Sequence, residues 1–226
     1  MQDSMTKIGL KDRKVARIRL ALVRHLREKL NEMPFNQIRV EDLCEVAMIS
    51  KVTFFKYFPE KDALLVFSNA CWIMELQVLI RRKELVGIPA IAEMYASMGR
   101  VCNESPHSVR AFYGMISENL KFPMGVELSR ADKLELFPDE DPDGYETRST
   151  GNFIHRHIQY ALDHHQIATN LDQFEISSLI GSIFNGTGVL GLRLFPDRPG
   201  DLFAVNIGIL YKCLNYKGIQ ESPSKI

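Results

Sequence analysis

The sequence lacks the features of secreted, membrane-spanning and zinc-binding proteins. Its four cysteines, Cys44, Cys71, Cys102 and Cys213, are widely spaced, with no CxxC pair and no nearby histidine at zinc-ligand spacing. They are expected to be reduced, mostly buried thiols. The N-terminus alternates charged and apolar residues from Lys7 onward, unlike a signal peptide, and no apolar run approaches the roughly 20 residues of a membrane span. These absences predict a soluble cytoplasmic protein with no membrane contact.

Signatures of catalysis and of metal or cofactor binding are also missing. The chain contains no Gly-rich phosphate loop and no GxSxG, HExxH or zinc-cluster motif. Histidines fall on a predicted helix over 147–164, but no two of them have the four-residue spacing of metal-binding helices. The acidic run DEDPDG at 139–144 lacks the oxygen spacing of a calcium loop, so a mobile loop over 120–146 is the preferred interpretation, with some local helix around 127–136. Neither an enzyme nor a cofactor or metal is expected.

Charge has no overall excess, but it is unevenly distributed. Residues 1–61 hold 13 Lys and Arg against 8 Asp and Glu, a net charge of +5, and residues 62–226 hold 15 against 20, a net charge of −5. A basic N-terminal part suits the neutralisation of DNA phosphates. An ordinary solvated surface would have the same composition, so charge alone does not decide.

The stretch 35–65 predicts two short helices that meet at a tight corner, followed by a third. Ser50 is placed to cap the second helix, and Phe54 and Phe58, four residues apart, should be buried together. The other side of this helix presents cations, hydroxyls and apolar groups suited to phosphates and base edges, namely Lys51, Val52, Thr53, Phe55, Lys56 and Tyr57. The pattern indicates a helix-turn-helix with a recognition helix.

The run AMISKVTFFKYFPEKDALL at 47–65 resembles the AGVSKGTLYHYFPSKEALL type of segment of the TetR family of bacterial transcriptional repressors. The shared residues are Ala47, Ser50, Lys51, Thr53, Tyr57, Phe58, Pro59, Lys61, Ala63, Leu64 and Leu65. The resemblance implies an all-α fold in which a three-helix helix-turn-helix domain is joined to a larger helical domain for ligand binding and dimerisation. It also implies contact with double-stranded DNA through Arg39, Ser50, Lys51, Val52, Thr53, Phe55, Lys56, Tyr57 and Lys61.

Several residues depart from the family pattern. Met48 stands where glycine is usual at the corner, and a non-glycine residue in the left-handed region costs about 1 kcal/mol. Val52 replaces another common glycine, and Phe55 replaces a tyrosine and so lacks a hydroxyl for phosphate. Ile38 and Arg39 replace a threonine pair that normally supplies a helix cap. The turn and its capping are therefore expected to differ from the family pattern.

The expected domain organisation is a helix-turn-helix domain at 1–65, with an arm at 1–10, and a helical domain at 66–226. A helix over 12–30 should bury one apolar stripe and present arginines on its opposite side. A long helix from Lys61 to about Lys83 should leave the small domain and enter the larger one. Gly87 and Pro89 end it.

The last two predicted helices carry the features expected of a homodimer interface; the first starts at Asp172, with Glu175 as its capping partner, and the second spans 202–217. Several small residues on one helical face suggest that another backbone approaches closely, because glycine inside a helix costs up to ~1 kcal/mol against alanine. The resemblance implies a four-helix bundle with a second subunit, with close packing inside one subunit as the alternative. The expected interface residues are Gly181, Phe184, Gly188, Gly191, Phe203, Ile207 and Leu210.

The function implied is that of a dimeric, ligand-responsive transcriptional regulator, usually a repressor. A small, largely apolar effector of unknown identity would release it from a pseudo-palindromic operator. Adaptable apolar side chains are the candidates for the effector pocket: Trp72, Met94, Tyr95, Met98, Phe112, Tyr113, Met115, Phe153, His157 and Tyr160. The alternative is a DNA-binding or adaptor protein without a small-molecule effector, and an all-helical enzyme is disfavoured.

Overall fold

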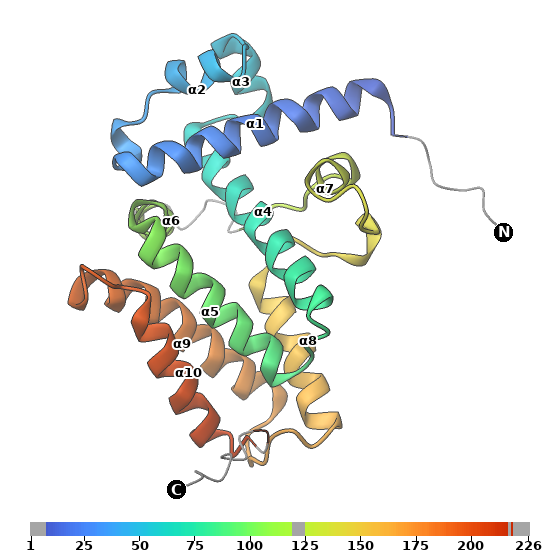
Figure 1. Cartoon of the computed structure of the whole chain (residues 1–226), viewed down its shortest axis with the longest axis vertical. Coiled ribbons are helices and arrows are strands. Elements are labelled where there is room, and N and C mark those ends of the chain that lie inside the picture. The colour runs from blue at the N-terminus through green and yellow to red at the C-terminus, as the bar shows by residue number, and fades with distance from the viewer. Residues whose placement is uncertain (1–7, 119–124, 217, 219–226) are drawn as a thin grey trace, which may run out of the picture. The chain divides into compact units, whose positions relative to one another are not determined.

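The computed structural model describes residues 8–118, 125–216 and 218, and within them the chain forms helices and no strands (Figure 1). The all-α fold class is confirmed. Residues 1–7 of the expected arm lie outside the described residues, and helix α1 begins at Leu10. The elements are α1 (Leu10–Glu32), η1 (Phe35–Gln37), α2 (Val40–Val46), α3 (Lys51–Tyr57), α4 (Lys61–Arg82), α5 (Ile88–Glu104), α6 (Pro106–Glu118), α7 (Arg130–Leu136), η2 (Pro142–Gly144), α8 (Thr150–Asp163), α9 (Gln173–Leu194) and α10 (Asp201–Cys213).

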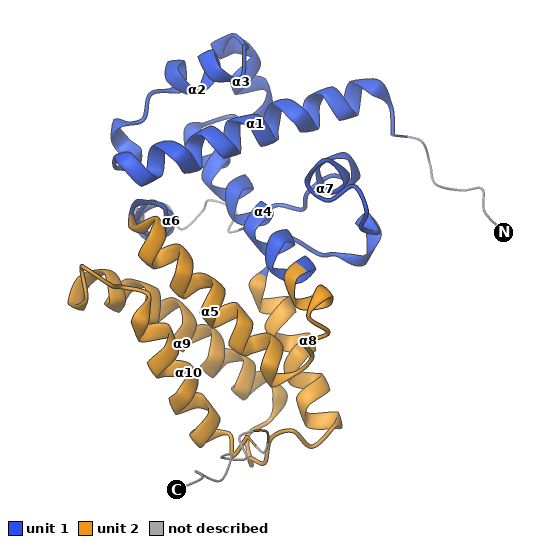
Figure 2. Ribbon diagram, in the orientation of Figure 1, with its two compact units in different colours: residues 1–78, 107–149 blue, residues 79–106, 150–226 orange. Residues whose placement is uncertain are grey.

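The helices form two compact units (Figure 2). Unit 1 comprises Met1–Val78 and His107–Ser149, and unit 2 comprises Leu79–Pro106 and Thr150–Ile226. Helix α4 therefore continues without a break from the first unit into the second. This division differs from the expected boundary at residue 65, because 107–149 shares a unit with the helix-turn-helix.

The core of unit 1 is built by apolar residues that recur at helical spacing. Leu22, Leu26 and Leu30 of α1 are fully or almost fully buried, as a stripe of period three to four predicts. They share one cluster with Leu43 of α2, with the buried aromatic residues of α3 and α4, and with side chains from 107–149. The helix-turn-helix and the later segment thus have a common hydrophobic core.

Segment 125–149 packs onto α1 through α7. Ser129 and Asp132 form a reciprocal capping box at the start of α7, with Ser129 N donating to Asp132 Oδ2 at 2.9 Å. Asp132 is fully buried and pairs with Arg19 of α1. Buried Thr147 donates its backbone N–H to Glu127 at 2.9 Å. The expectation of a mobile loop over 120–146 is therefore corrected for 125–146, because this part has a buried, hydrogen-bonded interior; residues 120–124 lie outside the described residues.

Unit 2 is centred on an aromatic cluster from three helices. Tyr95 of α5, Phe184 of α9 and Phe203 of α10 are buried and meet edge to face, with ring centroids 5.3 to 5.9 Å apart. The Tyr95 hydroxyl donates to the Ile180 carbonyl at 2.9 Å, so its polar group is satisfied inside the core. Helix α9 starts at the expected capping box, with Asp172 as its N-cap.

Helix α4 is long and apolar enough to cross a membrane by length and composition, with a mean hydropathy of 1.7, which the sequence had not led us to expect. Within the protein, 72% of that stretch is buried. The core helices of soluble proteins pass the same test of length and composition. The burial of α4 is that of a core helix.

Candidate DNA-binding surface

Helix α3 has the geometry of a recognition helix, with one face anchored and the other free. Ser50 is its N-cap and accepts a hydrogen bond from the Thr53 backbone N–H at 3.2 Å. Phe54 and Phe58 are buried with ring centroids 5.7 Å apart, and Phe58 also meets Phe67 of α4 at 5.4 Å. The predicted cap and the predicted aromatic pair are both confirmed. They fix which side of α3 faces outward.

The outward side of α3 carries the expected contact residues. Lys51, Val52, Phe55 and Lys56 are exposed, as is Ser50 before them, and Thr53 and Tyr57 are half-buried at the margin. Helix α3 contains two lysines and no acidic residue. Its local charge is therefore positive, which suits a surface that approaches phosphates.

An acidic residue lies among these cations, and the sequence pattern had not indicated it. Glu41 of α2 forms an ion pair with Lys51, and Arg39 lies 3.9 Å from the same carboxylate. The hydrogen bond from Lys51 lowers the pKa of Glu41, so this side chain stays ionised. Arg39 and Lys51 must therefore exchange part of this contact for phosphate if they bind DNA. Lys56 has no ion pair with any of the described residues.

Lys61 is placed differently from the other expected contact residues. Its ammonium donates to the carbonyls of Phe35 at 2.8 Å and Ile38 at 3.0 Å, and lies 4.1 Å from the centre of the Phe35 ring. Burial lowers the pKa of this group. Lys61 thus ties the start of α4 to η1 by bonding to two carbonyls at that turn, one of which, Phe35, also accepts from the Ile38 N–H at 3.1 Å. Its charge is used within the fold.

Of the two expected effects of the departures from the family pattern, the loss of the helix cap is seen and a different turn is not. Met48 adopts a left-handed backbone conformation with φ of 51°, so the corner keeps the geometry that glycine would favour. Arg39 is the N-cap of α2 and makes no side-chain cap hydrogen bond. Helix α2 therefore lacks the stabilisation of about 1 kcal/mol that a serine or threonine cap supplies.

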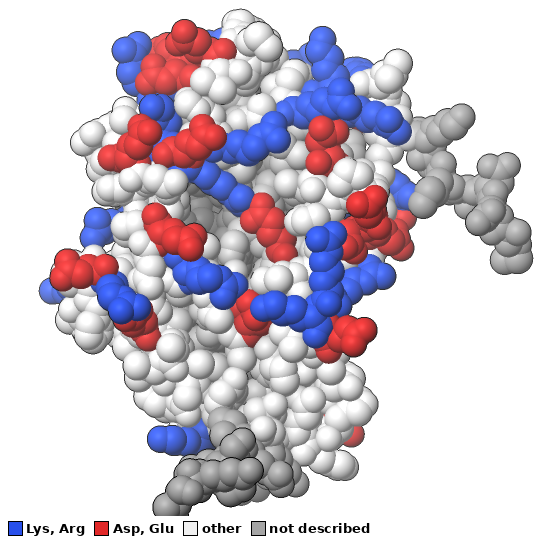
Figure 3. Space-filling model, viewed as in Figure 1, with Lys and Arg blue, Asp and Glu red and all other residues white. Residues whose placement is uncertain are grey.

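Basic side chains follow the exposed side of α1 (Figure 3). They are Lys11, Arg13, Lys14, Arg17 and Arg24. Glu135 of α7 lies 3.2 Å from Arg17 and neutralises part of this row. Arg19, next along the helix, is held by the buried Asp132.

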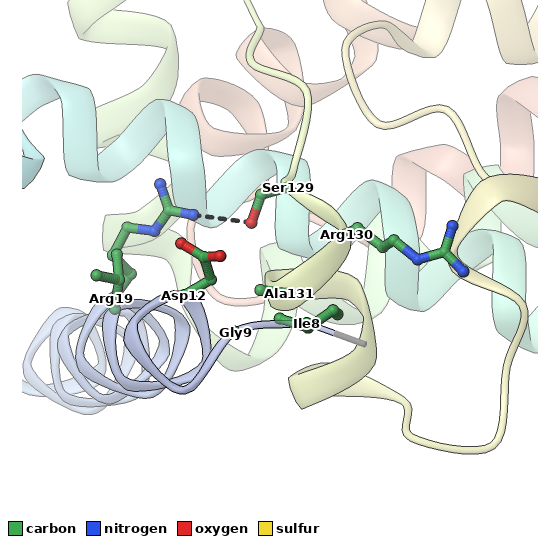
Figure 4. Close-up of a pocket in the computed structure, with 8 residues that line it drawn as sticks. Ile8, Gly9, Asp12, Arg19, Ser129, Arg130 and Ala131 are labelled. Carbon is green, nitrogen blue, oxygen red and sulfur yellow. Dashed lines mark hydrogen bonds between the residues drawn. The ribbon is translucent and has the colours of Figure 1, made fainter. Parts of the chain in front are cut away.

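A cleft of about 490 Å³ lies where α1 begins and α7 starts (Figure 4). It is lined by Ile8, Gly9, Asp12, Val15, Arg19, Ser129, Arg130 and Ala131. The guanidinium of Arg19 donates to Ser129 at 3.2 Å and is paired with Asp132. The Arg130 side chain extends away from the other lining residues. The cleft therefore offers no uncommitted arginine to an anion.

The ten expected effector-pocket residues are divided between the two units. Trp72, Phe112, Tyr113 and Met115 belong to unit 1, whereas Met94, Tyr95, Met98, Phe153, His157 and Tyr160 belong to unit 2. Met94, Tyr95 and Phe153 are core residues. His157 accepts a hydrogen bond from the Gly87 N–H at 3.3 Å, which places its ring at the start of α5.

Most of the expected dimer-interface residues face the interior of their own protomer. Phe184, Gly188, Gly191, Phe203 and Leu210 are buried, so they are not available to a second copy. A Cβ on Gly191 would lie 2.3 Å from the Pro199 carbonyl oxygen, which shows that the close backbone approach occurs inside one subunit. We correct the assignment for these five residues. Gly181 and Ile207 are half-buried, and Gly181 has open space above it.

Comparison with known proteins identifies the fold. No protein-family model and no curated protein matches the sequence. Among solved structures, a protein with unknown function from Rhodococcus sp. RHA1 is 14% identical, with a TM-score of 0.55, over 94% of this chain and 99% of that one. Salmonella enterica GusR is 15% identical, with a TM-score of 0.53, over 88% of this chain and 96% of that one. The chain has the TetR family fold. The resemblance read from residues 47–65 is thereby confirmed at the level of the fold.

Within this TetR-type fold, two features of the surface could not be read from the family pattern. Glu41 lies in the first turn of α2, and its ion pair with Lys51 reveals its position among the cations. The start of α7 has a sequence signal, since Ser129 and Asp132 have the spacing of a capping box. That signal marks a helix start but does not show that the helix packs on α1.

Proposed function

We propose that this chain is a dimeric DNA-binding transcriptional regulator, a repressor that a small, largely apolar molecule releases from a pseudo-palindromic operator. The observation that carries DNA binding is α3, an exposed helix with two lysines and no acid, anchored through Phe54 and Phe58. In a twofold dimer, two such helices would enter the major groove about one DNA turn, ~34 Å, apart. The proposal makes it a regulator and not an enzyme, and places it in the cytoplasm with its DNA.

The DNA surface is tested by charge removal at Lys56. Lys56→Ala should weaken binding to all duplexes, because a phosphate contact carries no sequence information. It should also lower the slope of log affinity against log salt concentration by about two, because each subunit of the dimer loses one contact. Lys83→Ala is a matched control, since Lys83 pairs with Glu93 in unit 2 at 2.7 Å. Unchanged affinity and salt slope for Lys56→Ala would show that the face is wrong. We assign Lys61 to positioning η1, so Lys61→Met should mainly lower stability.

The dimer is supported by apolar side chains that α9 and α10 leave uncovered. They are Leu179, Val189, Leu190, Leu194, Val205 and Ile209. Large apolar side chains exposed on two adjacent helices are typical of a protein interface, and these helices pack against one another within unit 2. A second copy would cover this face, with Gly186 and Gly208 allowing close approach because each has open space above it.

The interface is tested by placing charge on this face. Leu190→Glu and Ile209→Glu should each shift the mass measured by light scattering from dimer to monomer, because association would bury an unpaired carboxylate. Val86→Glu, at an exposed valine after α4, is the control. A dimeric mass for both variants would move the interface elsewhere.

The ligand response is supported by the methionine and aromatic residues of unit 2, including half-buried Met98 and Tyr160 beside buried Met94 and Phe153. The test recovers the native operator by selecting genomic fragments on the purified protein, then screens compounds suggested by the adjacent genes for release of that fragment. Saturable release by an apolar compound is expected. Release by highly charged metabolites alone would contradict an apolar effector. Absence of any saturable release would favour the alternative, a DNA-binding or adaptor protein without an effector.

A further inference from the structure

The DNA-facing side of the helix-turn-helix carries a stripe of exposed apolar side chains. Met48, Val52 and Phe55, spaced four and three residues apart, are exposed by 91%, 81% and 46%. The spacing places Val52 and Phe55 on one side of α3, with Met48 just before the helix at the corner. We call these three residues the apolar stripe.

The polar groups beside the apolar stripe are engaged within the protein. The hydroxyls of Ser50 and Thr53 lie 3.0 Å apart and bond to each other, and Ser50 also caps α3. Lys51 is paired with Glu41. The first turn of α3 therefore offers base edges mainly methyl and methylene groups and not hydrogen-bonding groups.

This chemistry limits what the stripe can recognise on DNA. In the major groove, bases present hydrogen-bond donors and acceptors, and the C5-methyl group of thymine is the apolar group among them. Apolar side chains therefore distinguish bases through that methyl. We propose that the apolar stripe reads thymine methyl groups, so that each half of the operator carries thymines where the stripe enters the major groove. This inference rests on the proposed DNA-binding function.

The charge around the stripe favours DNA over a protein partner as its occupant. Lys56 follows Phe55 directly, and α3 contains no acid. A phosphate backbone beside the major groove favours cations next to a base-reading surface, whereas a protein that covers an apolar stripe does not require them. Lys56 meets this condition directly, and Lys51 meets it once it exchanges its contact with Glu41 for phosphate. The stripe also continues the surface on which the proposed phosphate contact lies.

The experiment separates the methyl group from every other property of the operator. A duplex of ~30 base pairs, long enough for two half-sites, is selected from a random-sequence pool on the full-length protein. It is then synthesised with thymine and with uracil, which lacks only the methyl, and both affinities are measured by fluorescence anisotropy at one salt concentration. A scrambled duplex of the same composition gives the non-specific affinity. We expect the uracil duplex to bind weaker by about fourfold for each methyl contacted, because burial of one methyl-sized group contributes that much.

Two variants assign the effect to the stripe. Val52→Ala should lose affinity for the thymine duplex and show a smaller ratio between thymine and uracil duplexes than the wild type, since the two changes remove the same contact. Val86→Ala, at an exposed valine in unit 2, should keep the wild-type ratio.

The possible outcomes separate a failure of methyl recognition from a failure of the proposed DNA-binding function. Equal affinities for thymine and uracil duplexes, with preference over the scrambled duplex retained, would overturn methyl recognition and leave DNA binding intact. An unchanged ratio in Val52→Ala would show that another surface reads the methyls. No preference for any selected duplex over the scrambled one would contradict the proposed function itself.

Discussion

Acidification should weaken unit 2 through His157, a half-buried histidine at the junction of two helices. Its Nδ1 accepts a hydrogen bond from the Gly87 N–H at 3.3 Å, and its ring lies on Phe153 with centroids 4.4 Å apart. Burial lowers the pKa of His157 from its ordinary 6.5 to about 4, and nearby Arg156 acts in the same direction. A proton on Nδ1 would also face the Gly87 N–H and remove the acceptor. The folded state therefore requires the neutral ring.

The sign and size of the effect follow from proton linkage. Because the folded pKa is below the unfolded one, the unfolded chain takes up the proton first as pH falls through 6.5. The stabilisation is complete above that pH and is lost progressively toward pH 4. The shift sets an upper limit of about 3 kcal/mol, at 1.36 kcal/mol per pKa unit. Since the side chain keeps some exposure to solvent, we expect about 2 kcal/mol.

The assay is urea unfolding of the wild type and of His157→Asn between pH 7 and pH 4. Asparagine keeps a carbonyl acceptor near the position of Nδ1 but does not titrate in this range. The free energy of unfolding of the wild type should therefore fall more steeply with acid than that of the variant, because carboxylates that titrate in both cancel. Parallel curves, or a His157 pKa near 6.5 by NMR titration, would refute the reasoning.

Three further changes test the packing of each unit by urea unfolding. Gly191→Ala should destabilise by about 2–3 kcal/mol, because the new Cβ would overlap a backbone carbonyl. Gly114→Ala, inside α6 and with open space, should stabilise by up to ~1 kcal/mol; similar values for both would contradict this. Met48→Gly should stabilise the fold by about 0.5 kcal/mol, because glycine relieves the left-handed strain but also adds entropy to the unfolded chain, which offsets part of the gain. A loss of stability would show that the methionine side chain contributes to the fold. Asp132→Asn should lower the free energy of unfolding by about 2–3 kcal/mol, because it weakens the buried ion pair with α1. Glu135→Gln, which removes a more exposed ion pair, should lower it by less than ~0.5 kcal/mol. Equal losses for both variants would refute the difference between the buried and the exposed pair.

The sequence predicted those parts of the fold that depend on neighbouring residues. The Ser50 cap and the pairing of Phe54 with Phe58 act across three and four residues, so their signals are present in a short window. The same holds for Asp172 and Glu175 at the start of α9. The corner at Met48 was not predicted in the same way, because the absence of glycine led us to expect a different turn, whereas the left-handed geometry is retained.

Periodicity could not predict which apolar face of α9 is turned inward. Phe184 and Gly188 lie on the buried face, whereas Leu179 and Leu190 lie on the exposed one. Both faces are apolar, so the pattern gives two candidates for the core and no rule to choose between them. The glycines correctly indicated a close backbone approach, but that approach is to Pro199 of the same subunit.

The sequence also did not predict hydrogen-bonded pairs between residues that are far apart in the chain. These pairs change how the helix-turn-helix can move. Arg27 of α1 contacts Glu75 of α4 at 2.7 Å, and Gln77 donates to the Glu146 carbonyl at 2.6 Å. The part of α4 within unit 1 is therefore held both by α1 and by the segment that carries α7. A ligand signal that travels along α4 must move these elements together or break buried hydrogen bonds, each worth about 1 kcal/mol or more. The helix-turn-helix should thus respond as one body with α7, with any bend in α4 placed near residue 78, where the helix leaves unit 1.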